Sequence, residues 1–220
     1  MPKTQPQITA RPSPNCGPRR DGLTPSLVVL HYTAMHSAEA AIERLCDPAA
    51  EVSAHYLISI TGAVTMMVPE DKRAWHAGAG SWRGQDDINS RSIGIELDNL
   101  GTHPFAEPQM ASLETLLQAI MTRWGIAANG VIGHSDMAPG RKIDPGPHFD
   151  WARLARQGLA AQTVAQSPQT VDEDSFASCA HAAGYPQDTP FETLLATTRL
   201  RSAPWRRGPL THADYTLPSI

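Results

Sequence analysis

Residues 133–146, with the sequence GHSDMAPGRKIDPG, combine several ionisable side chains with residues that exclude a long helix or strand. The two Pro-Gly pairs of this segment interrupt regular structure. Because the apolar pair Val131-Ile132 precedes the segment, we expect a short strand that leads into a loop suited to chemistry. Within the loop, His134 and Asp144 are ligands of the type that zinc binds. A catalytic zinc ion also needs a third protein ligand and an open position.

A third ligand of this type follows a predicted buried strand. Residues 27–30, with the sequence LVVL, form a continuous apolar run that is typical of a strand buried on both faces, and His31 comes next. A histidine at the end of such a strand lies at the rim of the sheet, where open α/β folds bind their ligands. A single histidine among the nine in the chain is most often structural or on the surface. His31, His134 and Asp144 together are a candidate metal site.

Predicted strands and helices alternate along the chain. Strands are predicted over residues 26–33 and 131–132, a hairpin within 54–68, and helices over 37–46, 108–124 and 149–159. The clearest element is the helix over 108–124, whose apolar residues recur at helical spacing until Gly125 provides a stop. This alternation predicts an α/β layer fold.

Composition divides the chain into four parts. Residues 1–23 are polar and rich in proline and predict an extended arm, whereas residues 24–160 contain the alternating elements of the main domain. Residues 161–174 are rich in Gln, Ser, Thr and Pro and predict a linker. Residues 175–220 predict a small helical tail. With about 46 residues it is near the lower limit for an independent core, so we expect it to pack on the main domain.

Charge and composition exclude several classes of partner. A formal net charge of −4 argues against a nucleic-acid partner, which a basic patch would bind. We also predict no membrane partner, because no apolar stretch approaches the roughly 18–20 residues that span a bilayer. The N-terminus lacks the apolar region of a signal peptide, and the three distant cysteines indicate free thiols in a reducing compartment. The sequence therefore predicts a cytoplasmic protein and does not indicate its oligomeric state.

Six short motifs that include these ligands occur in a fixed order. They are residues 29–33 (VLHYT), 53–58 (SAHYLI), 74–78 (AWHAG), 89–96 (NSRSIGIE), 133–136 (GHSD) and 142–146 (KIDPG). Over roughly residues 24–158 they resemble the zinc-dependent N-acetylmuramoyl-L-alanine amidases of the type 2 family, relatives of the peptidoglycan recognition proteins. The resemblance implies a zinc amidase domain over 24–160 with a central mixed β-sheet flanked by helices. It also implies that His31, His134 and Asp144 hold Zn²⁺. The tail over 175–220 is more loosely similar to a reduced peptidoglycan-binding module.

The resemblance implies an acid/base role for Glu96 and an electrostatic role for Lys142. Ile93, Ile95 and Leu97 alternate with polar residues, so Glu96 projects from the opposite face of its strand, and Gly94 beside it favours close approach by another group. A carboxylate near zinc-bound water can accept its proton, and a lysine can stabilise the oxygen that becomes negative. From the residues alone, Asp98 competes with Glu96, and Arg141 competes with Lys142.

The same motifs contain candidate substrate-binding residues, which are His55, Trp75, His76 and Arg91. Trp82, between two of the motifs, is a weaker candidate for stacking on sugar or peptide. His55 is more often structural in such a hairpin. The resemblance implies hydrolysis of the amide between muramic or 1,6-anhydromuramic acid and L-alanine of peptidoglycan fragments. Without an export signal, we expect imported muropeptides as substrates and a role in cell-wall recycling. The alternatives are a phage-type endolysin and a non-catalytic muropeptide sensor.

Overall fold

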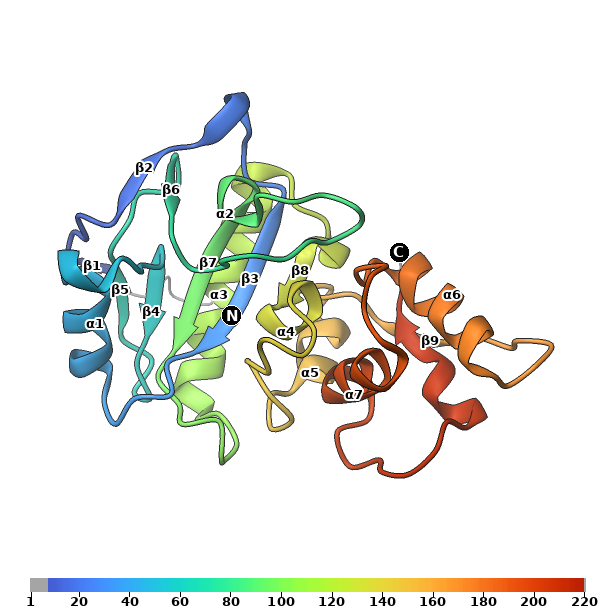
Figure 1. The fold of residues 1–220 in the computed structure, drawn as a ribbon. Coiled ribbons are helices and arrows are strands. Elements are labelled where there is room, and N and C mark those ends of the chain that lie inside the picture. Colours follow the sequence, from blue (N-terminus) through green and yellow to red (C-terminus); the bar gives the residue numbers. More distant parts are fainter. Residues whose placement is uncertain (1–7, 220) are drawn as a thin grey trace.

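A mixed sheet of six strands forms the centre of the fold. The computed structural model describes residues 8–219, and the strand order of the sheet is β1-β5-β4-β7-β3-β8. These strands are β1 (Ile8–Ala10), β3 (Leu27–Tyr32), β4 (Tyr56–Ile58), β5 (Val64–Met66), β7 (Ser92–Leu97) and β8 (Val131–Gly133). Strands β4, β7, β3 and β8 run parallel, whereas β5 pairs antiparallel with β4 (Figure 1). The predicted α/β fold with a central mixed sheet is confirmed.

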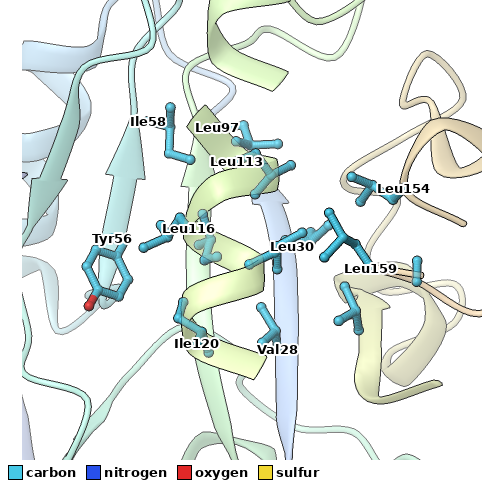
Figure 2. Packing of buried hydrophobic residues seen from close by; sticks show 14 of the residues in the cluster. Val28, Leu30, Tyr56, Ile58, Leu97, Leu113, Leu116, Ile120, Leu154 and Leu159 are labelled. Atoms are coloured by element: carbon cyan, nitrogen blue, oxygen red, sulfur yellow. The ribbon is translucent and has the colours of Figure 1, made fainter. Parts of the chain in front are cut away.

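Helix α3 (Glu107–Trp124) covers one face of this sheet. Leu113 and Leu116 of the helix belong to the same buried cluster as Val28 and Leu30 of β3, and Figure 2 shows the helix lying along these strands. The apolar residues of the helix recur every three or four positions, and this spacing places them on the side that faces the sheet. Gly125 ends the helix with a φ of 67°, as the sequence predicts for a stop.

Two further helices flank the sheet. Helix α1 (Ala38–Cys46) begins after Ser37, whose side chain accepts a hydrogen bond from the backbone of Ala40, as expected for the predicted cap. Helix α5 (Trp151–Arg156) is shorter than the prediction of 149–159. Asp150 caps its first turn, and Gly158 just beyond it has a φ of 70°, so both ends are set by local residues.

The predicted arm has more regular structure than its composition indicated. Residues 1–7 lie outside the described residues, but β1 forms an edge of the central sheet, and β2 (Cys16–Pro18) pairs with β6 (Lys72–Ala74). The Arg19 side chain donates hydrogen bonds to the backbone carbonyls of Ser90, Ser92 and Glu70. Backbone pairing with distant strands, which composition does not report, therefore fixes this segment against the main domain.

The C-terminal residues pack on the other face of the sheet. Helices α6 (Glu173–Ala183) and α7 (Phe191–Ser202) contribute Phe176 and Leu194 to a buried cluster that also contains Val29 and Ile132. Within the segment predicted as a linker, β9 (Thr163–Ala165) pairs antiparallel with β10 (Thr216–Pro218). The division into domain, linker and tail stays a prediction. Among residues 8–219, no helix is both long enough and apolar enough to cross a bilayer.

Candidate active site

The three predicted metal ligands meet at one end of the sheet. His31 lies in β3, His134 begins the short helix α4 (His134–Met137), and Asp144 lies in the loop that follows. The Nδ1 atoms of His31 and His134 are 2.9 Å apart. The Oδ2 atom of Asp144 lies 2.9 Å from Nδ1 of His31 and 3.0 Å from Nδ1 of His134. All three side chains are buried. The structure therefore forms a site that can hold a metal ion.

The hydrogen bond of the other ring nitrogen fixes the tautomer of His134. Nε2 of His134 lies 2.8 Å from the backbone carbonyl oxygen of Ala77, which can only accept a hydrogen bond. In the neutral form of the ring, the hydrogen therefore lies on Nε2. Nδ1 is left with a lone pair that points toward the other two ligands.

A chain of three hydrogen bonds fixes the tautomer of His31 in the same way. The hydroxyl of Ser92 donates to the carbonyl of Ile88 at 2.6 Å, so it accepts a hydrogen bond from Nε2 of His76 at 3.1 Å. Nδ1 of His76 is then an acceptor for Nε2 of His31, at 3.0 Å. It follows that Nδ1 of His31 also carries a lone pair. Neither Ser92 nor the contact of His76 with His31 was predicted. The sequence feature that could have identified Ser92 is its position two residues before Gly94, on the polar face of the same strand.

This donor set fits a divalent cation. Two imidazole nitrogens and a carboxylate oxygen lie within 3.0 Å of one another, as three ligands of one metal ion would. Burial, together with the neighbouring His134, lowers the pKa of His31 to about 4, so the ring is neutral at pH 7 and its contact with Asp144 is not an ion pair. Neutral imidazole nitrogens and a carboxylate oxygen are the ligands of catalytic zinc sites.

Glu96 stands beside these ligands. It is paired in register with His31 across strands β7 and β3, and both line a pocket of about 600 Å³. Its Oε2 atom is buried and has no hydrogen-bond partner among the described residues. Burial and the nearby charge of Asp144 raise the pKa of Glu96 to about 8. A carboxyl group with a pKa near neutrality is suited to accept and return a proton. Asp98, the competing carboxylate, does not line this pocket.

The structure also separates the two candidate cations of the loop. Arg141 donates hydrogen bonds to the carbonyls of Ala77, at 2.7 Å, and Ala79, so its guanidinium holds the loop that follows His76. Lys142 is exposed and lines the pocket with Asp144. This arrangement leaves the ammonium group of Lys142 available to a substrate.

Only some of the remaining predicted residues line the pocket. Trp75 and His76 line the pocket, whereas His55 and Arg91 do not. His55 is fully buried and accepts a hydrogen bond from the backbone of Gly94 at 3.0 Å. The prediction that Trp82 stacks on substrate is wrong, because only 2% of this side chain is exposed. It packs edge-to-face against Tyr185 of the tail, at a centroid distance of 5.3 Å.

Gly94 leaves the space that the His76 ring occupies. A Cβ atom at Gly94 would lie 2.4 Å from Cγ of His76, so Gly94→Ala must displace this ring and its hydrogen bond to His31. Because such partners of metal ligands are typically worth 10- to 100-fold in affinity, we expect Gly94→Ala to weaken the binding of a metal ion at this candidate site by about this factor. Competition with a chromogenic chelator measures the effect.

Gly17→Ala is the matched control for this substitution. A Cβ atom at Gly17 would meet no atom within 4 Å, so we expect this variant to leave metal binding at the candidate site unchanged. Equal zinc affinity in the Gly94→Ala and Gly17→Ala variants would show that His76 does not support His31.

Comparisons with known proteins agree with this geometry. The sequence profile of the family described as N-acetylmuramoyl-L-alanine amidase matches residues 21–147. The chain is 40% identical over 160 residues to the 1,6-anhydro-N-acetylmuramyl-L-alanine amidase AmpD of Citrobacter freundii. The alignment covers 65% of this chain and 86% of that protein.

Two solved structures of proteins bound to muropeptides also resemble the fold. One is the complex of the N-acetylmuramyl-L-alanine amidase AmiD from E. coli with anhydro-N-acetylmuramic acid-L-Ala-D-gamma-Glu-L-Lys. The match has a TM-score of 0.77 and 32% identity, and it covers 94% of this chain and 89% of that chain. The other is AmpDh3 from Pseudomonas aeruginosa in complex with anhydromuramic pentapeptide, with a TM-score of 0.77, 27% identity and coverage of 89% and 93%.

Proposed function

The chain belongs to the N-acetylmuramoyl-L-alanine amidase family, and from this premise we propose that His31, His134 and Asp144 hold a catalytic zinc ion. The enzyme hydrolyses the amide between muramic or 1,6-anhydromuramic acid and the L-alanine of peptidoglycan fragments. The observation that carries the proposal is the buried triangle of two imidazole lone pairs and one carboxylate oxygen beside Glu96.

Each side chain around the three proposed metal ligands has a separate role in hydrolysis. Zinc, when bound, supplies a Lewis acid that polarises the amide carbonyl and acidifies water. Glu96 accepts the proton of the attacking water and returns it to the leaving nitrogen of L-alanine, because its raised pKa suits both transfers. Lys142 stabilises the negative charge that develops on the carbonyl oxygen. His76 accepts a hydrogen bond from Nε2 of His31 and so keeps His31 in its tautomer, whereas Arg141 holds the loop that forms a wall of the pocket.

We further propose that the substrates are soluble fragments with an anhydromuramyl end, which the chain hydrolyses in the cytoplasm during recycling of the cell wall. The support is that the Citrobacter freundii relative is a 1,6-anhydro-N-acetylmuramyl-L-alanine amidase and that the two similar structures hold anhydromuramyl peptides. The test is mass spectrometry of the products from a defined anhydromuramyl peptide and from intact sacculi, treated side by side. Release of free peptide from sacculi at an equal rate would overturn the restriction to fragments.

Lys142→Ala is expected to lower kcat by about 10²- to 10³-fold, which is the usual cost of removing one donor to a developing oxyanion. Metal content should not change, because Lys142 is exposed at the pocket wall. Steady-state kinetics on a soluble muropeptide measure the effect.

Arg44→Ala is the control for Lys142→Ala, because Arg44 is another exposed cation that lines the same pocket from α1. We expect this variant to change KM more than kcat. A Lys142→Ala variant with unchanged kcat would remove Lys142 from the mechanism.

A further inference from the structure

We propose that Arg201 of helix α7 is a positioning residue for the metal ligand His134, so that the C-terminal tail takes part in forming the active site. This inference rests on the metal site proposed above. Nη1 of Arg201 donates a hydrogen bond of 2.7 Å to Oδ2 of Asp136. The two side chains are only 3% and 1% exposed. Moving the two side chains of a buried ion pair apart is costly, because each charge would then be buried without compensation. The pair therefore holds α7 and α4 in a fixed relative position.

Asp136 connects this ion pair to His134. It lies in the same short helix, α4, and its Oδ2 atom also accepts a hydrogen bond of 2.8 Å from the backbone N–H of Gly133. Gly133 directly precedes His134. The guanidinium of Arg201 also lies 3.4 Å from the carbonyl oxygen of Val131 in β8. One side chain of the tail therefore contacts both the strand that leads into His134 and the turn that follows it.

The packing around His134 transmits any shift of this turn to the metal ligands. A Cβ atom at Gly133 would lie 2.8 Å from Cδ of Pro145, so the backbone on the two sides of the site is closely packed. The backbone N–H of Ser135 donates to the carbonyl oxygen of Asp144 at 2.9 Å. If α4 moved, the distance between His134 and Asp144 would change with it.

The surroundings of the guanidinium favour arginine at this position. Cζ of Arg201 lies 3.9 Å from the centroid of the Trp151 ring, so the planar group stacks on the indole while it donates to Asp136. An ammonium group cannot do both with the same geometry. Tyr185, also in the tail, donates from its hydroxyl to Oδ1 of Asp136 at 3.2 Å. Both oxygens of Asp136 are thus held from the tail, and Figure 1 shows α7 beside α4 and α5.

Arg201→Met tests the proposal, because methionine keeps the apolar stem and removes the charge. We expect zinc affinity, measured by chelator competition without substrate, to fall about 10- to 100-fold. At saturating zinc, kcat should fall while KM stays close to its original value. Arg201→Lys should restore part of the affinity, because it restores the charge but not the stacking.

Arg199→Met is the matched control on the same helix. Arg199 forms an ion pair at 2.8 Å with the buried Asp214, and both residues lie within the tail. We expect this variant to lose thermal stability and to keep its zinc affinity and kcat. If Arg201→Met binds zinc as tightly as Arg199→Met at a comparable loss of Tm, the ion pair is only structural and the proposal is wrong.

A second variant and the original chain separate the role of Arg201 from a failure to fold and from the absence of a metal site. If Arg201→Met does not fold, Tyr185→Phe removes a single hydroxyl from Asp136 and should weaken zinc binding in the same direction, and unchanged affinity would overturn the proposal. A chain of the original sequence that binds no zinc would contradict the proposed metal site itself. Tight zinc binding by both the original chain and Arg201→Met would contradict only the role of Arg201.

Discussion

Replacing His134 with alanine is expected to yield a folded chain without bound zinc, with turnover lowered by on the order of 10³-fold or more. His134 contributes one of two imidazole ligands, and its loss leaves Asp144 and His31 as an incomplete set. A catalytic metal ion typically supplies several kcal/mol of stabilisation to the developing charge, and about 1.4 kcal/mol corresponds to a factor of ten in rate. Elemental analysis of the purified protein and kinetics on a soluble muropeptide measure the two effects.

His36→Ala is the control for this experiment. His36 is exposed and does not line the pocket, so we expect one zinc ion per chain and unchanged turnover in this variant. A full complement of zinc in the His134→Ala protein would show that the metal is bound elsewhere.

The ligands of the proposed metal site could be predicted from the sequence because each is tied to a local pattern. His31 follows a continuous apolar run, so we expected it at the rim of the sheet, and we expected His134 in the loop that follows another short apolar run. Asp144 follows in a loop that Pro and Gly exclude from regular structure. In parallel strands such residues meet at one edge, and the register of β3 with β8 brings them together.

The supporting contacts could not be predicted, because they join residues that are distant in sequence. The partner of Asp136 is Arg201, 65 positions away, and both belong to charged types that are normally exposed. Trp82 stands in a glycine-rich segment and was expected to contact substrate, but Tyr185 covers it. Periodicity reports which face of an element is apolar. It does not report which other element will cover that face.

The role of His76 illustrates the same limit at shorter range. Its place before Ala-Gly-Ala-Gly predicted an open loop at the substrate groove, and it does line the pocket. Its ring also fills the space above Gly94 and accepts a hydrogen bond from His31. Gly94 indicated that some group approached the strand closely, but only the fold identifies that group as His76.

Glu96→Gln is expected to keep the zinc ion and the fold but to lower kcat by about 10²- to 10⁴-fold, the usual contribution of a general acid/base. The amide has nearly the same shape as the carboxyl group but cannot accept the proton of the attacking water. Burial raises the pKa of Glu96 to about 8, so this site disfavours a charge at position 96 and should tolerate a neutral amide there. Zinc content, thermal unfolding and steady-state kinetics measure these outcomes separately.

Asp98→Asn provides the decisive comparison for Glu96. Asp98 follows Glu96 by two residues, but its Oδ2 atom accepts a hydrogen bond from the backbone of Ile60 at 3.4 Å, and it does not line the pocket. We therefore expect Asp98→Asn to retain near-normal kcat. A cation bound beside Glu96 favours the ionised carboxylate. The pH at which kcat rises should therefore lie below about 8, the value to which burial raises the pKa of Glu96. A nearly normal kcat in Glu96→Gln, together with an inactive Asp98→Asn, would assign the proton transfer to Asp98 and contradict the mechanism proposed above.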